Sequence, residues 1–126
     1  MHLKKFKQIK GCEIISIYDK NIKKLKVISK KYKIKYIKNE NEIFKDKQIN
    51  LVSIASYDSD HYSHASRAIL NNKNVFIEKP AFTSSKECLK IKKLLKNRDI
   101  GIFSNLILRA SDRFISLKKR IKKKFF

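Results

Sequence analysis

Four groups of polar side chains have the types and the placement needed for chemistry on a small ligand. Each group follows an apolar run; they are Asp19, residues 56–61, residues 78–80, and residues 105–109. The carboxylate of Asp19 can accept hydrogen bonds from two neighbouring hydroxyl groups, or it can cap a helix that begins near Asn21. The ammonium group of Lys79 can contact an oxygen of a bound molecule, or it can be one more solvated lysine. From position alone, both interpretations stay open for each residue.

The histidines and cysteines do not form a metal-binding pattern. His61 and His64 are spaced to lie on one face of a helix, but no third ligand follows at a suggestive spacing. We therefore expect packing or capping for His64, and no metal site. Cys12 and Cys88 lie far apart in apolar segments and form no C-x-x-C pair. They are predicted to be reduced core residues of a cytoplasmic protein.

The elements that must position these residues follow from the apolar periodicity. A strand buried on both faces is expected at residues 12–18, and further strands at residues 50–56, 75–77 and 100–104; residues 34–37 fit a short strand. Helices are expected up to Gly11, over residues 22–32, in a short segment after Asn39, and over residues 61–70 and 84–95. Asn39 with Glu42 and Ser84 with Glu87 have the spacing of capping boxes.

This alternation of strands and helices predicts the α/β class. Each crossover must carry the chain back over the sheet, so we expect a doubly wound parallel sheet with helices on both faces. In such sheets the ligand crevice lies beyond the carboxyl ends of the strands, where the strand order reverses. The four polar groups all follow predicted strands, which places them at this crevice.

The composition bounds the alternatives. The chain has 126 residues, enough for one domain, and 32 Lys and Arg against 11 Asp and Glu give a net charge of +21. The excess is mostly lysine, which A/T-rich codons can produce without selection for an anionic ligand. With 42% hydrophobic residues, two glycines and one proline, the chain is neither a disordered polyelectrolyte nor collagen-like. No apolar run is long enough to span a membrane, and no membrane partner is expected.

Three blocks of the sequence carry a specific signature: Val52-Ser-Ile-Ala-Ser-Tyr-Asp-Ser-Asp-His61, then Ala68-Ile-Leu, then Asn74-Val-Phe-Ile-Glu-Lys-Pro80-Ala. They resemble the cofactor domain of the Gfo/Idh/MocA family of NAD(P)-dependent oxidoreductases, in which a strand leads to a histidine, a helix follows, and the next strand ends in Glu-Lys-Pro. Residues 12–19 resemble the second strand of that Rossmann domain, which ends in a ribose-binding acid. Asn105 and Arg109 match the Asn and Arg that often follow its sixth strand.

The resemblance implies a nicotinamide dinucleotide as cofactor. Asp19 would bind the adenosine ribose and favour NAD over NADP, because a 2′-phosphate would meet its charge, although Lys20 offsets part of that charge. Lys79 would be catalytic. The implied cofactor-binding residues are Asp19, Ser56, Tyr57, His61, Glu78, Lys79 and Pro80, and those on the substrate side are Asn105 and Arg109. The implied reaction is hydride transfer between nicotinamide and a hydroxyl-bearing carbon of a sugar or polyol.

The chain also departs from the family. The family places a strand and a Gly-x-Gly-x-x-Gly turn about 20 residues before the ribose acid, whereas residues 1–3 resemble the middle of its first helix. We therefore expect residues 1–126 to form a single partial dinucleotide-binding domain, with βα units to about residue 104, then a linker and a basic helix towards an absent second domain. Tyr57 replaces the usual Pro, and Asn72 the usual Gly, which Asn mimics at positive φ.

Three functions follow from this reading. The first is a partial cofactor domain that binds NAD weakly without its glycine loop and has at most trace activity alone. The second is a basic module that binds nucleic acid or an acidic surface, suggested by the +21 charge and residues 118–124, although the lysines are spread over every helix and arginine is scarce. The third is an interaction fragment whose sheet is completed by a homo-oligomer or a complementing subunit.

Overall fold

A computed structural model describes residues 2–125 of the chain, with their side chains as far as residue 121. The elements follow in the order α1 (His2–Phe6), α2 (Ile22–Tyr32), α3 (Asn41–Lys45), β1 (Leu51–Ile54), α4 (Asp58–Leu70), β2 (Asn74–Ile77), α5 (Ser85–Leu95), β3 (Ile102–Ser104), the 3₁₀ helix η1 (Ile107–Ala110) and α6 (Asp112–Phe125). The strands at residues 50–56, 75–77 and 100–104 and the helices α2, α4 and α5 were expected. The structure moves their ends by a few residues, and α4 begins at Asp58 rather than at His61.

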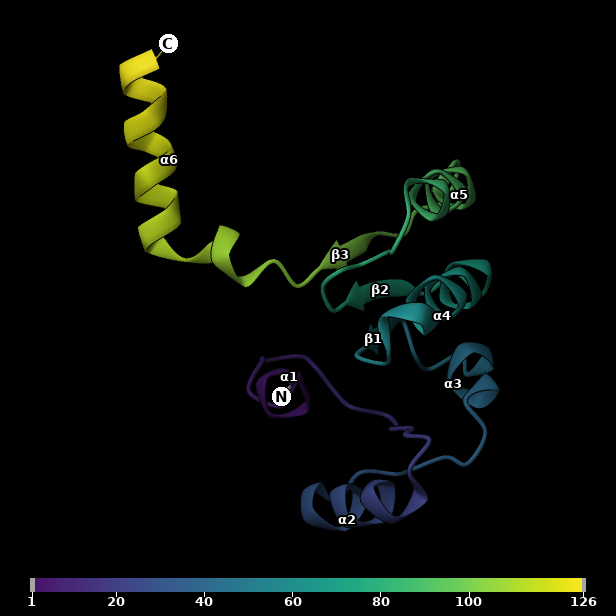
Figure 1. The fold of residues 1–126 in the computed structure, drawn as a ribbon. Coiled ribbons are helices and arrows are strands. Elements are labelled where there is room, and N and C mark those ends of the chain that lie inside the picture. Colours follow the sequence, from purple (N-terminus) through teal and green to yellow (C-terminus); the bar gives the residue numbers. More distant parts are fainter. Residues whose placement is uncertain (1, 126) are drawn as a thin grey trace.

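The three strands form one parallel sheet in the order β1-β2-β3. Val52 and Ile54 of β1 pair with Val75 and Ile77 of β2, and all four side chains are buried. Helix α4 packs on β1 and β2 and also against α5. Its Ala65, Ala68 and Ile69 are fully buried, so the small alanines let the helix approach the sheet closely. The core of the protein therefore lies between the sheet and these two helices (Figure 1).

Helix α1 covers part of the opposite face of the sheet. The Phe76 side chain points away from the buried Val75 and Ile77, because successive residues of a strand face opposite sides. Its ring makes edge-to-face contacts with His2 at 5.2 Å and with Phe6 at 5.6 Å between centroids. Helices thus lie on both faces, and the doubly wound α/β class expected from the sequence is confirmed (Figure 1).

Helices α2 and α5 each begin at a side chain that caps the first turn. Asn21 Oδ1 accepts a hydrogen bond from the backbone N–H of Lys24, and Ser84 Oγ accepts one from Glu87. The reciprocal contact of Glu87 goes to the N–H and hydroxyl of Thr83 rather than to Ser84. The predicted box between Asn39 and Glu42 is wrong, since the Asn39 side chain accepts from the N–H of Asn41 instead.

The largest difference from the sequence-based prediction concerns residues 12–18. The predicted buried strand is wrong, because these residues are half-buried or exposed and the segment joins its neighbour, residues 34–37, through one isolated bridge between Ile17 and Tyr36. A strand needs a ladder along its length, and within the described residues the hydrogen bonds between this segment and residues 34–37 are those at the bridge, from Ile17 N–H to the Lys35 carbonyl and from Ile37 N–H to the Ile17 carbonyl. For the same reason, the strand expected at residues 34–37 is reduced to the bridge.

Several smaller expectations are also corrected. Helix α1 ends at Phe6 rather than near Gly11, although Gly11 does adopt the positive φ of 80° for which glycine suits a turn. Cys88 is exposed on α5 and is not a core residue, while Cys12 is half-buried, and both are free thiols. Asn72 has φ of 55°, so it takes the left-handed conformation expected of a glycine substitute.

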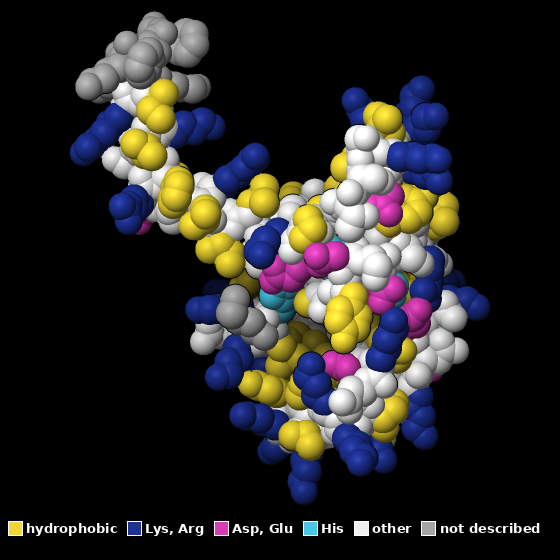
Figure 2. Space-filling view, in the orientation of Figure 1, with side chains coloured by type: hydrophobic (Ala, Val, Ile, Leu, Met, Phe, Trp, Pro, Cys, Tyr) yellow, Lys and Arg dark blue, Asp and Glu magenta, His cyan; other side chains and the backbone are white. Residues whose placement is uncertain are grey.

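Helix α6 projects away from the rest of the described chain and packs on η1 (Figure 1). This is the basic helix expected at the end of the chain. Its apolar side chains Phe114, Ile115, Leu117 and Ile121 are each 40–50% exposed. Lys and Arg side chains lie along this helix and over the body alike, whereas Asp and Glu gather near the middle of the face in Figure 2.

Candidate functional site

The candidate site lies where the three strands end. The ladder continues one residue past each strand, since Glu78 N–H donates to the carbonyl of Ile54 at 3.0 Å and Asn105 N–H donates to that of Ile77 at 2.8 Å. These two hydrogen bonds bring Ile54, Glu78 and Asn105 to the same edge of the sheet. The predicted meeting of polar groups from β2 and β3 is therefore present in the structure.

Glu78 is the centre of the polar cluster at this edge. Its Oε1 accepts hydrogen bonds from Asn105 Nδ2 at 2.9 Å and from His2 Nε2 at 2.5 Å, and its Oε2 accepts from the Lys79 N–H at 3.3 Å. The hydrogen bond from Asn105, followed by that from His2, lowers the pKa of Glu78 against the opposing effect of partial burial. The carboxylate is ionised at neutral pH and holds the start of the loop after β2.

His2 reaches this cluster from the other end of the chain. Its Nδ1 lies 2.8 Å from Ser53 Oγ, while its Nε2 contacts Glu78. Sequence reasoning named neither His2 nor Ser53 as a site residue, because no local pattern links positions 51 and 76 residues apart. The only available signal was the position of His2 within the helix that resembles the family's first one.

Lys79 is exposed, and its ammonium group makes no hydrogen bond or ion pair with the residues that the structure describes. The next residue, Pro80, is held by α4, because its carbonyl oxygen lies 2.8 Å from Nδ1 of His61. The peptide bond between Lys79 and Pro80 is cis. His61 itself has no exposed surface. It therefore reaches the crevice only through Pro80 rather than lining it, and His61 and His64, although three residues apart on α4, have different surroundings.

Ser56 is held from α4 by a second polar network. Its hydroxyl lies 3.0 Å from Nδ1 of His64, and Nε2 of His64 lies 3.3 Å from Oε2 of Glu40. Arg67 donates to Glu40 Oε1 and to Asn41 Oδ1, both at 2.6 Å, and this pairing lowers the pKa of Glu40 more than His64 does. The network anchors α3 and the loop after β1 to α4. Tyr57, the next residue, is 77% exposed at the mouth of the crevice.

Asp19 stands apart from this cluster. Its Oδ1 accepts from the Asn21 N–H at 2.8 Å, and its Oδ2 lies 3.2 Å from Lys24 Nζ. The helix cap is Asn21 rather than Asp19, so Asp19 shapes the turn before α2 and keeps lone pairs directed at solvent. Its neighbour Lys20 pairs with Asp60 of α4 at 2.7 Å, which raises the pKa of Lys20 and lowers that of Asp60.

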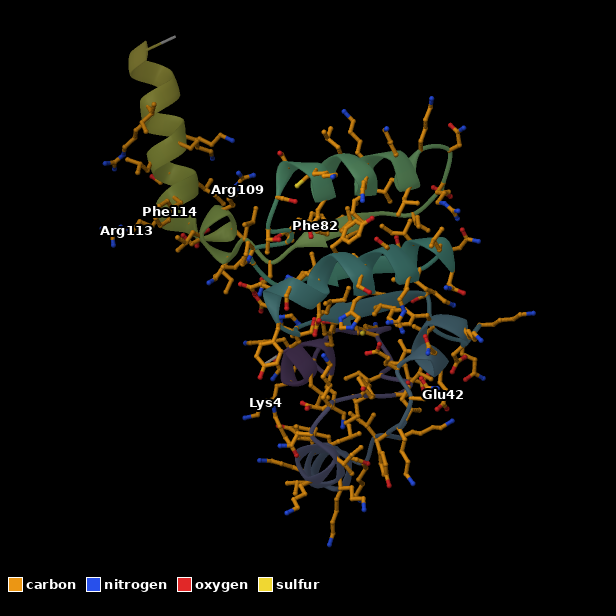
Figure 3. The ribbon with its side chains drawn as sticks, turned by 45° about the vertical axis from the view of Figure 1, so that its right-hand side comes forward. Lys4, Glu42, Phe82, Arg109, Arg113 and Phe114 are labelled. Atoms are coloured by element: carbon orange, nitrogen blue, oxygen red, sulfur yellow. The ribbon has the colours of Figure 1, made fainter. Side chains whose placement is uncertain are left out.

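Arg109 lies on η1, beside the first turn of α6 with Arg113 and Phe114 (Figure 3). Its guanidinium group makes no hydrogen bond or ion pair with the described residues, whereas Asn105, its predicted companion, binds Glu78. An apolar pocket of about 440 Å³ lies next to Asn105, between α1 and the sheet. Its walls are His2, Lys5, Phe6, Ile9, Phe76, Asn105 and Ile107.

No three side chains of His, Cys, Asp or Glu come together as metal ligands in the part of the chain that the structure describes. Among the described helices, none combines the length and apolar character needed to cross a bilayer.

Comparison with known proteins decides the family. The Gfo/Idh/MocA model, described as an oxidoreductase family with an NAD-binding Rossmann fold, matches residues 1–105. The chain belongs to the Gfo/Idh/MocA oxidoreductase family. The matched part corresponds to the NAD-binding Rossmann domain of that family, which confirms the resemblance drawn from the Glu78-Lys79-Pro80 block.

Individual relatives agree with the family and also show how much of it is present. The chain is 26% identical over 110 residues to an uncharacterized oxidoreductase of Synechocystis, covering 86% of this chain and 30% of that protein. It is 27% identical over 84 residues to inositol 2-dehydrogenase of Acidothermus cellulolyticus, covering 66% of this chain and 25% of that protein. The chain therefore spans less than a third of the length of these two curated relatives.

A solved structure shows the same fold. A 3-ketoreductase from Actinomadura kijaniata, determined in complex with NADP, superposes with a TM-score of 0.87 at 13% identity. The overlap covers 96% of this chain and 37% of that one. At this identity, the likeness establishes the fold alone.

Residues at two places of the crevice suit the ends of a dinucleotide. A carboxylate such as that of Asp19 is the kind of group that accepts hydrogen bonds from ribose hydroxyls, and Lys79, next to Glu78 in the chain, carries an ammonium group with no partner among the described residues. The middle is different, because the 126 residues include only Gly11 and Gly101 and neither belongs to a glycine-rich turn. This chain thus has groups that fit the ribose and nicotinamide ends, but it offers no glycine loop for the pyrophosphate.

Proposed function

We propose that this chain binds a nicotinamide dinucleotide along the carboxyl ends of its strands, as the cofactor domain of an oxidoreductase acting on a sugar or polyol hydroxyl. The observation that carries the proposal is the cluster at the ends of β2 and β3. There Asn105 orients Glu78, Glu78 holds the Lys79 N–H, and the Lys79 ammonium has no partner within the described part of the chain. The name of one relative, an inositol 2-dehydrogenase, supports the substrate class.

Each residue has a distinct part in this proposal. Asp19 would accept hydrogen bonds from the adenosine ribose, which favours NAD over NADP. Lys79 would contact the nicotinamide ribose or a substrate oxygen. Ser56, Tyr57 and Pro80 would shape the crevice wall, and Asn105 and Arg109 would face the substrate. The bound nicotinamide would supply the hydride acceptor or donor, and the protein orients the reactants around it.

The absence of a glycine turn within this sequence limits the proposed activity. We propose that these 126 residues on their own bind the dinucleotide weakly and turn over no more than a trace of substrate, because they include no glycine-rich turn to hold the pyrophosphate. Both cysteines are free, which supports the proposed cytoplasmic setting. A purified sample that oxidised a panel of sugars and polyols with NAD at an ordinary enzymatic rate would contradict the proposed inactivity.

Calorimetric titration with NADH at low and high salt tests the binding. Two substitutions should weaken it by about tenfold each, since each removes one charged contact of roughly 1–3 kcal/mol: Asp19→Asn at the ribose end and Lys79→Met at the reactive end. Asp99→Asn and Lys86→Met change the same charges on exposed residues outside the site and serve as controls. Binding that disappears in high salt, or responds equally to all four variants, would mean that only the +21 charge attracts the dinucleotide.

A further inference from the structure

His61 is a polar side chain in the protein core with one hydrogen-bonding partner. It is 0% exposed, and its Nδ1 lies 2.8 Å from the carbonyl oxygen of Pro80. Because a carbonyl can only accept, Nδ1 must carry the hydrogen. Its Nε2 is also buried and has no partner among the described residues. A proton on that nitrogen would place an unpaired charge in the core, so the geometry favours the neutral imidazole with Nε2 bare.

The backbone around Lys79 is held on both sides. On the N-terminal side, the Lys79 N–H donates to Oε2 of Glu78, which Asn105 orients from β3. On the C-terminal side, His61 of α4 holds the carbonyl of Pro80. The Lys79 ammonium itself has no partner among the described residues. These contacts therefore fix the backbone from which the Lys79 side chain projects, while its ammonium group stays available to a ligand.

We propose that His61 is a positioning residue: as the Nδ1–H tautomer it fixes the Pro80 carbonyl and thereby the direction of Lys79, without touching the cofactor itself. The consequence for cofactor binding rests on the proposed function, whereas the hold on the loop does not. An apolar residue of similar size would fill the same space without a buried, unpartnered nitrogen. The imidazole therefore contributes a specific contact through Nδ1 rather than packing alone.

The tautomer can be observed directly. In the ¹⁵N-labelled protein, long-range ¹H–¹⁵N correlation distinguishes a ring nitrogen that carries hydrogen from one that does not, and loss of signals in His61→Asn assigns the ring. We expect a protonated Nδ1 and a bare Nε2 for His61. A ring protonated at Nε2, either alone or with Nδ1, would overturn the proposal.

Amide hydrogen exchange measures the hold on the loop. His61→Leu should raise exchange at the amide of Lys79, which donates to Glu78, by at least about tenfold, while Val75 and Ile77 of β2 stay protected. His61→Asn should restore most of the protection, because its side-chain N–H lies near the position of Nδ1. Unchanged loop exchange in the Leu variant, or exchange raised equally in β2, would overturn the proposal. If the Leu variant does not fold, protection of the loop in the Asn variant, together with the ring spectrum, decides the question.

NADH titration of a double-mutant cycle separates the two proposals. If the wild type binds, His61→Leu should weaken binding by about tenfold, and should add little in a protein that already carries Lys79→Met, because both changes remove the same contact. Independent, additive losses would show that His61 does not act through Lys79. If the wild type binds no NADH, the proposed function fails, while the exchange and ring measurements still decide the role of His61.

Discussion

Two apolar regions of this chain differ in strand pairing and in burial. Residues 51–104 form three paired strands under two helices, and five of their apolar side chains are fully buried, namely Ala65, Ala68, Ile69, Val75 and Ile77. Residues 12–37 contain apolar runs as well, but they join through a single bridge at Ile17, and only Leu25, Ile34 and Ile37 are buried among them. An apolar run thus becomes a buried strand only where a ladder partner and a covering helix are both present.

The largest effect is expected from a cavity in the better ordered region. Ile77→Ala removes a fully buried side chain from β2 and should lower the free energy of unfolding by about 2–5 kcal/mol. The matched change Ile15→Ala lies in the poorly paired segment, where the half-buried side chain only borders the core, and should lower it by less than half as much. Urea denaturation of both variants measures the difference. Equal losses would show that residues 12–18 belong to the same cooperative core.

A smaller effect is expected from the ion pair that joins α3 to α4. The Arg67 guanidinium holds the pKa of Glu40 below its ordinary value of 4.5, so the folded state binds the proton less readily than the unfolded state. The resulting stabilisation is complete above about pH 4.5, and it is lost as the pH falls through the lowered pKa of the folded protein. For this partly exposed pair we expect a contribution of about 1 kcal/mol to the free energy of unfolding.

Unfolding measured between pH 7 and pH 3 tests this contribution. Glu40→Gln should reduce stability at pH 7 and flatten the acid side of the profile, because the variant has no carboxylate to protonate at this position. Glu42→Gln, an exposed change on the same helix α3, should leave the profile as it is. A wild-type slope that survives in Glu40→Gln would assign the acid sensitivity to other carboxylates.

The smallest effects on stability are expected from substitutions of the two glycines. Gly11 has φ of 80° with open space around it, so Gly11→Ala should cost about 1 kcal/mol through backbone strain alone. At Gly101 an added Cβ would lie 2.8 Å from the ring of Phe103, which is 58% exposed and free to swing aside. Gly101→Ala should therefore cost no more than about 0.5 kcal/mol. Thermal unfolding of the two variants gives the order, and the reverse order would mean that the Phe103 ring is held in place.

Local sequence patterns predicted the elements whose partners are close in the chain. The βα units from β1 to β3 have short crossovers, and Glu78 and Asn105 follow directly from the strand ends. The wrong prediction of a strand at residues 12–18 has a non-local cause. An apolar run indicates that its side chains favour burial, but it does not indicate whether a pairing strand lies beside it. His2 and Ser53 were missed for the same reason, because the contacts of His2 with Ser53 and Glu78 join positions 51 and 76 residues apart.

The burial of His61 did have a local signal. His61 lies on the same helical stripe as Ala65, Ala68 and Ile69, at spacings of four, seven and eight residues, which is the stripe that packs on the sheet. The three-residue spacing from His64 indicated only that the two histidines share a helix face, whereas the spacing from the alanines indicated that His61 is buried against the sheet. The contact with Pro80 could not be predicted, because it depends on how closely α4 approaches the loop after β2.

Helix α6 affects how the protein behaves as a solute. Each molecule carries +21 charges, and at 0.01 M salt their mutual repulsion acts over a screening length of about 30 Å. At 0.15 M the screening length falls to about 8 Å, and the exposed stripe of Phe114, Leu117 and Ile121 on one molecule can meet that on another. Raising the salt should therefore favour clustering of the molecules while it weakens their hold on anions, and dilution into low salt should disperse them.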